Sequence, residues 1–194
     1  MSKRQIMLCF VRSDSSVLQE SWLNTAASFF APRAVRNGPP YIHAELLFPP
    51  KDNGAKKADL YGDACSIVYG GTVHFTKKRF SRKEWEFRSM ECSEEQYNDM
   101  KDFCKLHVGD TFNHLGYFMY WAGMFAPKPM FYTYFGMRPK WYCSEIVIGA
   151  LKKGGIFDNS FPAAEHPDSL YHAVKNRSMM DCGRNMREVQ LQFV

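Results

Sequence analysis

A cysteine at the start of an amphipathic helix is the residue of this chain best placed to act as a nucleophile. Cys143 lies in the segment WYCSEIVIGALKKGG at 141–155, where apolar residues recur at helical spacing before two lysines and two glycines. This pattern predicts a helix with Cys143 in its first turn. Unpaired N–H groups and the positive end of the helix dipole lie there, and both favour a thiolate over a thiol.

A base that can accept the thiol proton lies 100 residues earlier in the chain. His43 belongs to the segment YIHAELLF at 41–48, which predicts a strand. A cysteine at a helix start with a histidine on a strand is a recurrent arrangement in thiol hydrolases. Glu45 follows His43 by two residues, so it shares the same face of the strand about 7 Å away, from where its carboxylate can orient the imidazole.

Each of these residues also has a structural interpretation. A buried cysteine is commonly a small core residue, and a single strand histidine commonly has no chemical role. Glu145 requires no chemistry, because the helix dipole alone favours an acidic residue in the first turn. Cys104, His107 and His114 are close in sequence but lack paired-ligand spacing, so we expect no metal site and no cofactor.

The order of the elements predicts one α+β domain over 1–194, built on a mostly antiparallel sheet. A polar loop is expected from Pro49 to about Asp63. The expected strands lie at 6–11, at 41–48, once or twice within 65–75, at 85–90 and at 188–194. The expected helices run from the Ser13–Ser16 caps to Phe30, from the Ser93–Gln96 capping box to about His107, from Leu115 to about Phe125, over 141–155, and around 167–174.

Composition restricts the class of protein. The net charge is +5, and no apolar run is long enough for a membrane span or a signal-peptide core. Six cysteines without paired spacing favour a cytoplasmic or other reducing intracellular compartment. The basic patch at 77–83 predicts a solvated turn or strand edge, and we expect no nucleic-acid partner; contact of the patch with nucleic acid or anionic lipid is the less favoured interpretation.

The segment between Tyr117 and Tyr142 is rich in aromatic residues and directly precedes Cys143. Its prolines and basic residues exclude a membrane-spanning helix. One interpretation is a core helix followed by a packed loop. The alternatives are an apolar groove leading to Cys143, which suits acyl chains, and a face that contacts a partner or the surface of a membrane.

The order of these motifs resembles the circularly permuted NlpC/P60 papain-like proteins, the YiiX-like group of bacteria and its relatives in large DNA viruses. The shared order is a strand histidine, a G-x-x-F-x-x-x-G element at 109–116, a helix opened by Tyr142 and Cys143, and a proline-led helix after His166. In unpermuted relatives the cysteine helix comes first. The resemblance covers roughly 41–174 and implies a papain-like fold, with an antiparallel sheet or half-barrel packed against helices.

The same resemblance implies the roles of the site residues. Cys143 is the expected nucleophile and His43 its base. A polar residue on the strand after the histidine strand holds the imidazole tautomer in many relatives, and none of the plausible positions is an obvious match: Ser66, Tyr69 and His74. We therefore rank Glu45 first for this role.

These residues predict a cysteine hydrolase or acyl transferase, of the thiol protease, amidase or thioesterase kind. Its expected substrate is a peptide, another amide or a lipid ester. The rival hypothesis is a catalytically silent binding or virion-associated module on the same fold.

Overall fold

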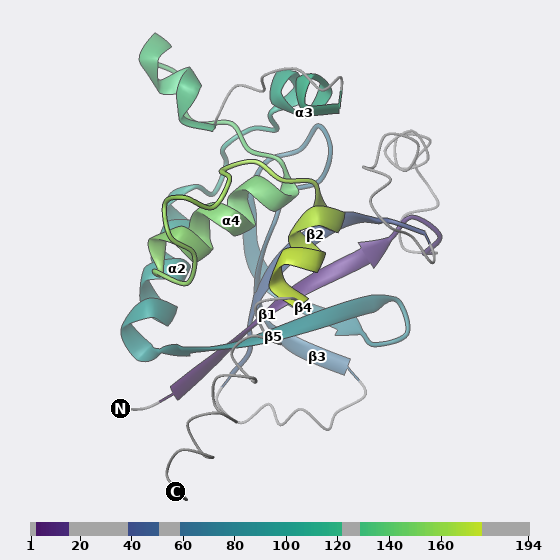
Figure 1. Ribbon diagram of the computed structural model, residues 1–194. Helices are drawn as coiled ribbons and strands as arrows, with labels where there is room; N and C mark the ends of the chain where they lie inside the picture. Colours follow the sequence, from purple (N-terminus) through teal and green to yellow (C-terminus); the bar gives the residue numbers. More distant parts are fainter. Residues whose placement is uncertain (1–2, 16–38, 51–58, 122–128, 176–194) are drawn as a thin grey trace, which may run out of the picture.

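The computed structural model describes residues 3–15, 39–50, 59–121 and 129–175 (Figure 1). The strands are β1 (Lys3–Arg12), β2 (Tyr41–Phe48), β3 (Asp59–Ser66), β4 (His74–Ser81) and β5 (Trp85–Ser93). The helices are α2 (Glu94–Leu106), α3 (His114–Trp121), the 3-10 helix η2 (Pro129–Phe135), α4 (Cys143–Lys153) and a short helix at 167–175. The α+β class, with an antiparallel sheet packed against helices, is confirmed.

The five strands form one antiparallel sheet in the order β4-β3-β2-β1-β5. β4 and β5 lie at opposite ends of this order, yet the ring of Phe80 in β4 contacts that of Trp85 in β5, with centroids 4.9 Å apart. The sheet is therefore strongly curled. We call its concave side the inner face, and it carries the apolar cluster Met7, Cys9, Val11, Leu47, Leu60, Ala64, Phe80 and Trp85.

The other side of the sheet, the outer face, is covered by helices. α2 and α4 pack against each other and against the sheet (Figure 1). Because side chains alternate across a strand, β1 sends Ile6, Leu8 and Phe10 to this side and its intervening residues to the inner face. β1 is thus buried on both faces, which explains its nearly continuous apolar sequence.

Several predicted boundaries are confirmed. β2 spans 41–48 as expected. The Ser93 hydroxyl accepts from the Gln96 N–H at 3.1 Å, and the Gln96 side chain accepts from the Ser93 N–H at 3.0 Å, so the predicted capping box opens α2. α4 begins at Cys143, and Gly155, with φ +66°, takes the left-handed conformation expected after its end.

β3 and β4 differ most from the predicted strand boundaries. The polar loop expected to reach about Asp63 ends earlier, because β3 begins at Asp59 and pairs with β4 along its whole length. β4 continues to Ser81, past the Phe75 boundary expected from sequence, so most of the basic patch lies in an edge strand. The helix expected to run to Phe30 and the strand at 188–194 lie outside the described residues.

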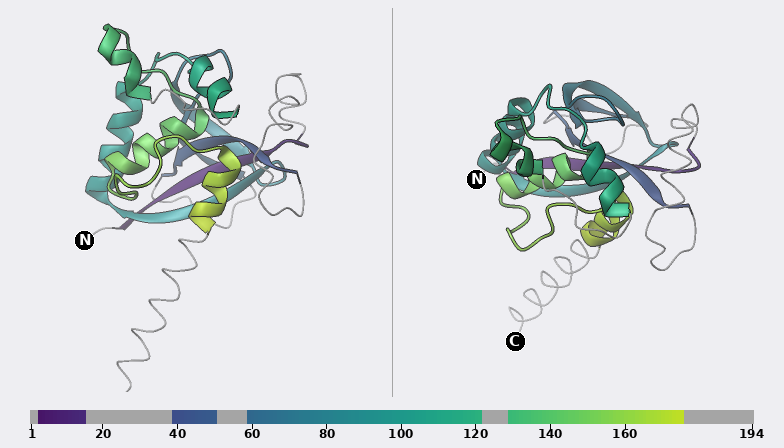
Figure 2. Two further views of the ribbon diagram at one scale, coloured as in Figure 1. Left: turned by 45° about the horizontal axis from the view of Figure 1, so that its top comes forward. Right: turned by 90° about the horizontal axis from the view of Figure 1, so that it is seen from above.

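The aromatic segment before Cys143 combines packed and exposed parts. Tyr132, Trp141 and Tyr142 are buried, whereas Tyr134 of η2 is 87% exposed and Phe135 is also exposed. η2 projects away from the sheet (Figures 1 and 2). Within the described ranges, no helix combines the length and apolar character required to cross a bilayer.

The capping box gives a direct test of how α2 is held. Ser93→Ala removes the side-chain acceptor for the Gln96 N–H, and we expect the free energy of unfolding to fall by about 1 kcal/mol. Chemical denaturation measures this change. Ser89→Ala, at an exposed position of β5, is the matched control and should change stability by less than about 0.5 kcal/mol; an equal loss in both variants would contradict the role of the cap.

Candidate functional site

The structure brings together the three residues that the sequence singled out. Cys143 is the first residue of α4, His43 lies in β2, and the two are close enough for Cys143 to be the strongest influence that raises the pKa of His43. Glu45 lies next to His43 on the same face of β2, with Glu45 Oε1 3.0 Å from His43 Nε2. Nε2 is thus occupied by the carboxylate, which leaves Nδ1 as the ring nitrogen that faces Cys143.

The pairing of β2 explains how a helix on the outer face reaches this histidine. β2 pairs with β3 over Leu46–Phe48, so among the described residues the half of β2 that carries His43 has no strand partner on that flank. On its other flank β2 pairs with β1, where His43 lies opposite Val11 and Glu45 opposite Cys9. The open flank of β2 therefore admits the start of α4 to the imidazole.

Glu45, ranked first for the orienting role, is in direct contact with the imidazole. It is 1% exposed, and within the described residues its hydrogen-bond partners are His43 and Lys78, both on Oε1. The other proposed positions lie elsewhere. Ser66 and His74 pair at the ends of β3 and β4, and Tyr69 packs on the ring of Phe112.

Lys78 is the member of the site that the sequence interpretation missed. Its Nζ lies 2.6 Å from Glu45 Oε1, so this residue of the basic patch turns to the inner face instead of being fully solvated. Side chains alternate between the two faces of a strand, so Lys78 shares a face of β4 with buried Phe80. This alternation could have indicated that Lys78 points to the inner face. The contact with Glu45 depends on the curl of the sheet, which the sequence does not specify.

The charges of the site support one another. Burial acts to lower the pKa of His43, but hydrogen bonds to Cys143 and then to Glu45 outweigh it and raise the pKa to about 10. Burial acts to raise the pKa of Glu45, while His43 and then Lys78 bring it below its ordinary value. Burial, aided by Glu45, raises the pKa of Cys9 well above the usual range, so this neighbour remains a thiol.

The first turn of α4 is held by a buried carboxyl group. Glu145 Oε2 accepts from the Tyr142 N–H at 3.0 Å and from Asn113 Nδ2 at 3.3 Å. Burial, as the largest influence, raises the pKa of Glu145 well above its ordinary value. The helix dipole explains why an acidic residue is favoured at this position. The hydrogen bond to Asn113, in contrast, joins segments far apart in the sequence and gives Glu145 a role in positioning Cys143.

Asn113, which donates to Glu145, belongs to the 109–116 element. Asn113 Oδ1 accepts from the Tyr132 hydroxyl at 2.7 Å and from the Gly116 N–H at 2.9 Å. A Cβ at Gly116 would lie 2.3 Å from Asn113 Nδ2, so only glycine fits there. The second glycine of the motif therefore serves the packing of Asn113 and, through it, the start of α4.

Asp110 secures the loop that leads into α4. Its buried carboxylate accepts from Trp141 Nε1 at 3.1 Å and lies 2.7 Å from His107 Nδ1 and 2.6 Å from Arg138 Nε. His107 is thus engaged by an aspartate, and Cys104 is buried in the core. In the part of the chain that the structure describes, no cluster of three or more histidine, cysteine or acidic residues is arranged to hold a metal ion.

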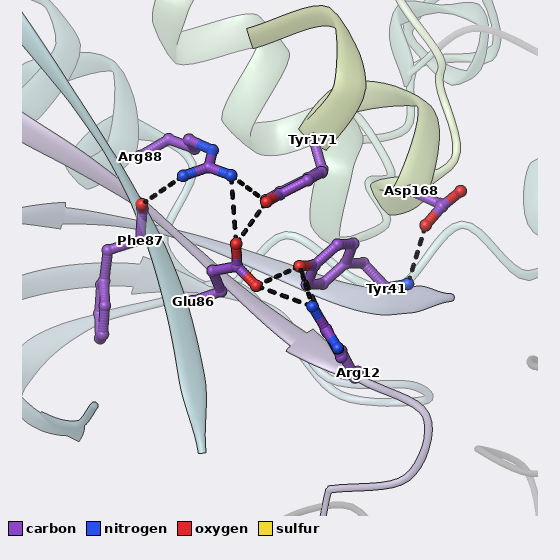
Figure 3. Close-up of polar contacts among 7 residues, drawn as sticks. All are labelled: Arg12, Tyr41, Glu86, Phe87, Arg88, Asp168 and Tyr171. Carbon is purple, nitrogen blue, oxygen red and sulfur yellow. Dashed lines mark hydrogen bonds and ion pairs between the residues drawn. The ribbon is translucent and has the colours of Figure 1, made fainter. Parts of the chain in front are cut away.

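A tyrosine and carboxylate network fixes the start of β2, two residues before His43 (Figure 3). The hydroxyls of Tyr41 and Tyr171 both donate to Glu86, and their rings stack with centroids 4.1 Å apart. The Tyr41 N–H also donates to Asp168 Oδ1 at 3.0 Å. The predicted short helix at 167–175 therefore docks on β2 and positions the strand that carries the imidazole.

A hollow of about 510 Å³ lies next to this network, between the end of β1 and the start of β5. Its lining includes Arg12, Glu86 and Trp85. The ring of Trp85 also meets that of His43, with centroids 6.1 Å apart. The hollow is thus separated from the imidazole by one aromatic side chain.

Comparison with known proteins gives no relative from which a role can be transferred. No family model, curated protein or solved structure matches the chain.

The contact with His43 predicts that Cys143 reacts faster with iodoacetamide than Cys92 does. Both residues are 6% exposed, so access alone does not separate them, and burial raises the pKa of Cys92 to about 11. Mass spectrometry after brief labelling of the folded protein measures the two rates. Equal rates, or faster labelling of Cys9, Cys65 or Cys104, would contradict the assignment of Cys143 as the activated thiol.

The causes of the His43 shift predict how it responds to substitution. Cys143→Ser removes the strongest contact that raises the pKa of His43, so this pKa should fall from about 10 towards 6.5. Glu45→Gln should lower it as well, by a smaller amount. NMR titration of the imidazole provides the measurement, and a wild-type ring that titrates near 6.5 would contradict the described contacts.

Proposed function

We propose that the protein is a thiol hydrolase or acyl transferase with Cys143 as nucleophile and His43 as general base. One observation carries this proposal: Cys143 lies beside an imidazole whose Nε2 is 3.0 Å from a buried carboxylate. An apolar core that merely accommodated a cysteine would not require this array. The arrangement supports nucleophilic catalysis because base and orienting group are both in place.

The first half of the proposed reaction forms a thioester. The Cys143 thiolate attacks the carbonyl carbon of an amide or ester, and the carbonyl π electrons move to oxygen. When the tetrahedral intermediate collapses, the bond from carbon to the leaving nitrogen or oxygen breaks, and the His43 imidazolium donates its proton to that leaving group. Glu45 keeps the ring oriented throughout the transfer.

The second half releases the acyl group. His43, now neutral, removes a proton from water while the water oxygen attacks the thioester, and Cys143 leaves as a thiolate. The product is a carboxylic acid. If an alcohol or amine replaces water, the same step transfers the acyl group, which is why one site supports both hydrolase and transferase activity.

The position of Cys143 at a helix start supplies a means of stabilising the oxyanion. The first N–H groups of a helix have no intrahelical partner and point away from its N-terminus. A carbonyl held at the sulfur would lie close to these groups. In other enzymes, loss of one such donor costs about 3 kcal/mol of transition-state stabilisation.

The order of the site residues along the chain supports a permuted papain-like architecture. His43 comes from a strand that precedes the cysteine helix, and the sheet curls with α2 and α4 on its outer face. The NlpC/P60 resemblance implies the same order. We propose this fold as the origin of the Cys143–His43 arrangement.

Exposed aromatic rings in the segment before Cys143 favour a substrate with an apolar part. η2, eight residues before Cys143 at its nearest end, exposes the rings of Phe131, Tyr134 and Phe135. Such rings can hold an acyl chain or lie against a membrane surface. The same rings can contact an apolar side chain of a peptide. The substrate screen therefore includes amides as well as esters of different chain length.

One observation favours the rival function, a catalytically silent binding module. Cys143 is only 6% exposed, so a substrate carbonyl must displace neighbouring groups to reach the sulfur. A binding module has no such requirement. Labelling of Cys143 separates the two, because a permanently covered thiol remains inert to a small alkylating agent.

Substitution of the pair tests the proposal. We expect Cys143→Ser and His43→Ala each to lower kcat/KM at least about a thousandfold on any ester or amide that the wild type turns over, equivalent to about 4 kcal/mol of transition-state stabilisation. Glu45→Gln should lose less, because it still accepts a hydrogen bond from the ring. Cys92→Ser is the matched control and should retain turnover; activity that survives in Cys143→Ser would refute the proposal.

A further inference from the structure

We propose that Lys78 is a positioning residue of this site, whose ammonium group keeps the Glu45 carboxylate ionised and oriented while His43 gains and loses its proton. The inference rests on the proposed function of Cys143 and His43. It extends the array by a fourth side chain, contributed by β4, a strand that neither His43 nor Cys143 belongs to.

The contact geometry is the first support. Lys78 Nζ lies 2.6 Å from Glu45 Oε1, and His43 Nε2 lies 3.0 Å from the same oxygen. Glu45 Oε2 is buried and accepts no hydrogen bond from the described residues. A single carboxylate oxygen is therefore shared by the Lys78 ammonium group and by the ring that takes part in the proposed proton transfer.

The surroundings of the ammonium group are the second support. Lys78 Nζ lies 4.9 Å from the ring centroids of both Phe80 and Trp85, where cation–π attraction fixes its direction. Trp85 in turn packs against the His43 ring. The same indole therefore contacts both of the side chains that engage Glu45.

The charges around Glu45 give Lys78 its function. His43 faces the carboxylate from β2, Lys78 from β4 and Cys9 from β1, and Cys143 of α4 contacts the far side of His43. Cys9 is a neutral thiol at physiological pH because burial raises its pKa well above the usual range. With Cys143 as thiolate and His43 as imidazolium, the signs alternate along Cys143, His43, Glu45 and Lys78.

This alternation matters at the moment of proton transfer. When His43 gives its proton to the leaving group, a buried carboxylate with no other cation would be left beside a neutral ring, which is unfavourable. Lys78 stays charged and keeps Glu45 ionised. The carboxylate then continues to accept from the Nε2–H, so Nδ1 remains the nitrogen that accepts the next proton.

Removal of the charge should move the titration of the whole array. In Lys78→Met the negative charge of Glu45 is no longer balanced by a second cation. That charge favours the imidazolium, so the pKa of His43 should rise, and it disfavours a thiolate nearby, so alkylation of Cys143 should require a higher pH. We expect the midpoint of Cys143 alkylation against pH, and that of the His43 NMR titration, each to move up by about 0.5–1 pH unit. Neither readout requires a known substrate.

Three companion variants distinguish this role from simple packing. Lys78→Arg retains the charge and should restore both midpoints. Lys77→Met removes a charge from the adjacent exposed position of β4 and should leave them unchanged. Lys78→Gln, without charge but still able to donate to Glu45, should behave as Lys78→Met does and serves if the methionine variant does not fold.

The Glu45→Gln background shows whether Lys78 acts through the carboxylate. Addition of Lys78→Met there should move the midpoints by less than half the amount seen in the wild-type background. Equal shifts in both backgrounds, or no shift in Lys78→Met and Lys78→Gln, would overturn the inference. Wild-type Cys143 that alkylates no faster than Cys92 would instead refute the proposed function, so the two failures are distinguishable.

Discussion

The Glu45 carboxylate lies at 1% exposure on a concave sheet face whose other inward side chains are mostly apolar. An ionised carboxylate in such a place requires cations or strong hydrogen-bond donors, since burial alone favours its neutral form. His43 and Lys78 meet this requirement at distances of 3.0 and 2.6 Å from one oxygen. The ionisation of His43 is favoured by Cys143 and then by this carboxylate, so Glu45 links the charge of Lys78 to the proposed activation of Cys143.

The fold brings these groups together through two features of the sheet. β2 separates from β3 before Leu46, which leaves His43 accessible to the start of α4 from the outer side. The curl of the sheet, marked by the Phe80–Trp85 contact, turns Lys78 of an edge strand towards β2. The helix start is in turn fixed by Glu145 and Asn113. The charged groups on the inner face and the helix on the outer face thus meet at the one stretch of β2 that lacks a β3 partner.

Local features of the site were predictable because short stretches of sequence determine them. The strand at 41–48, the capping box of α2 and the helix start at Cys143 follow from periodicity and capping chemistry. The early start of β3 was not predictable, because this part of the strand is formed by pairing with β4 and not by an apolar pattern of its own. Lys78 and Asn113 escaped notice for the same reason. Their roles arise from contacts across the sheet and between the 109–116 element and α4, which no single segment encodes.

The central claim is that Cys143 and His43 form a working nucleophile and base, and acylation by an activated ester tests it most directly. p-Nitrophenyl acetate is mixed with the protein, and the acyl adduct is mapped by mass spectrometry over time. The account predicts one acetyl group on Cys143, formed with release of one p-nitrophenolate and then lost to water, with both steps slowed strongly in His43→Ala. An adduct spread over surface lysines, or a Cys143 adduct that forms and decays equally fast without His43, would contradict it.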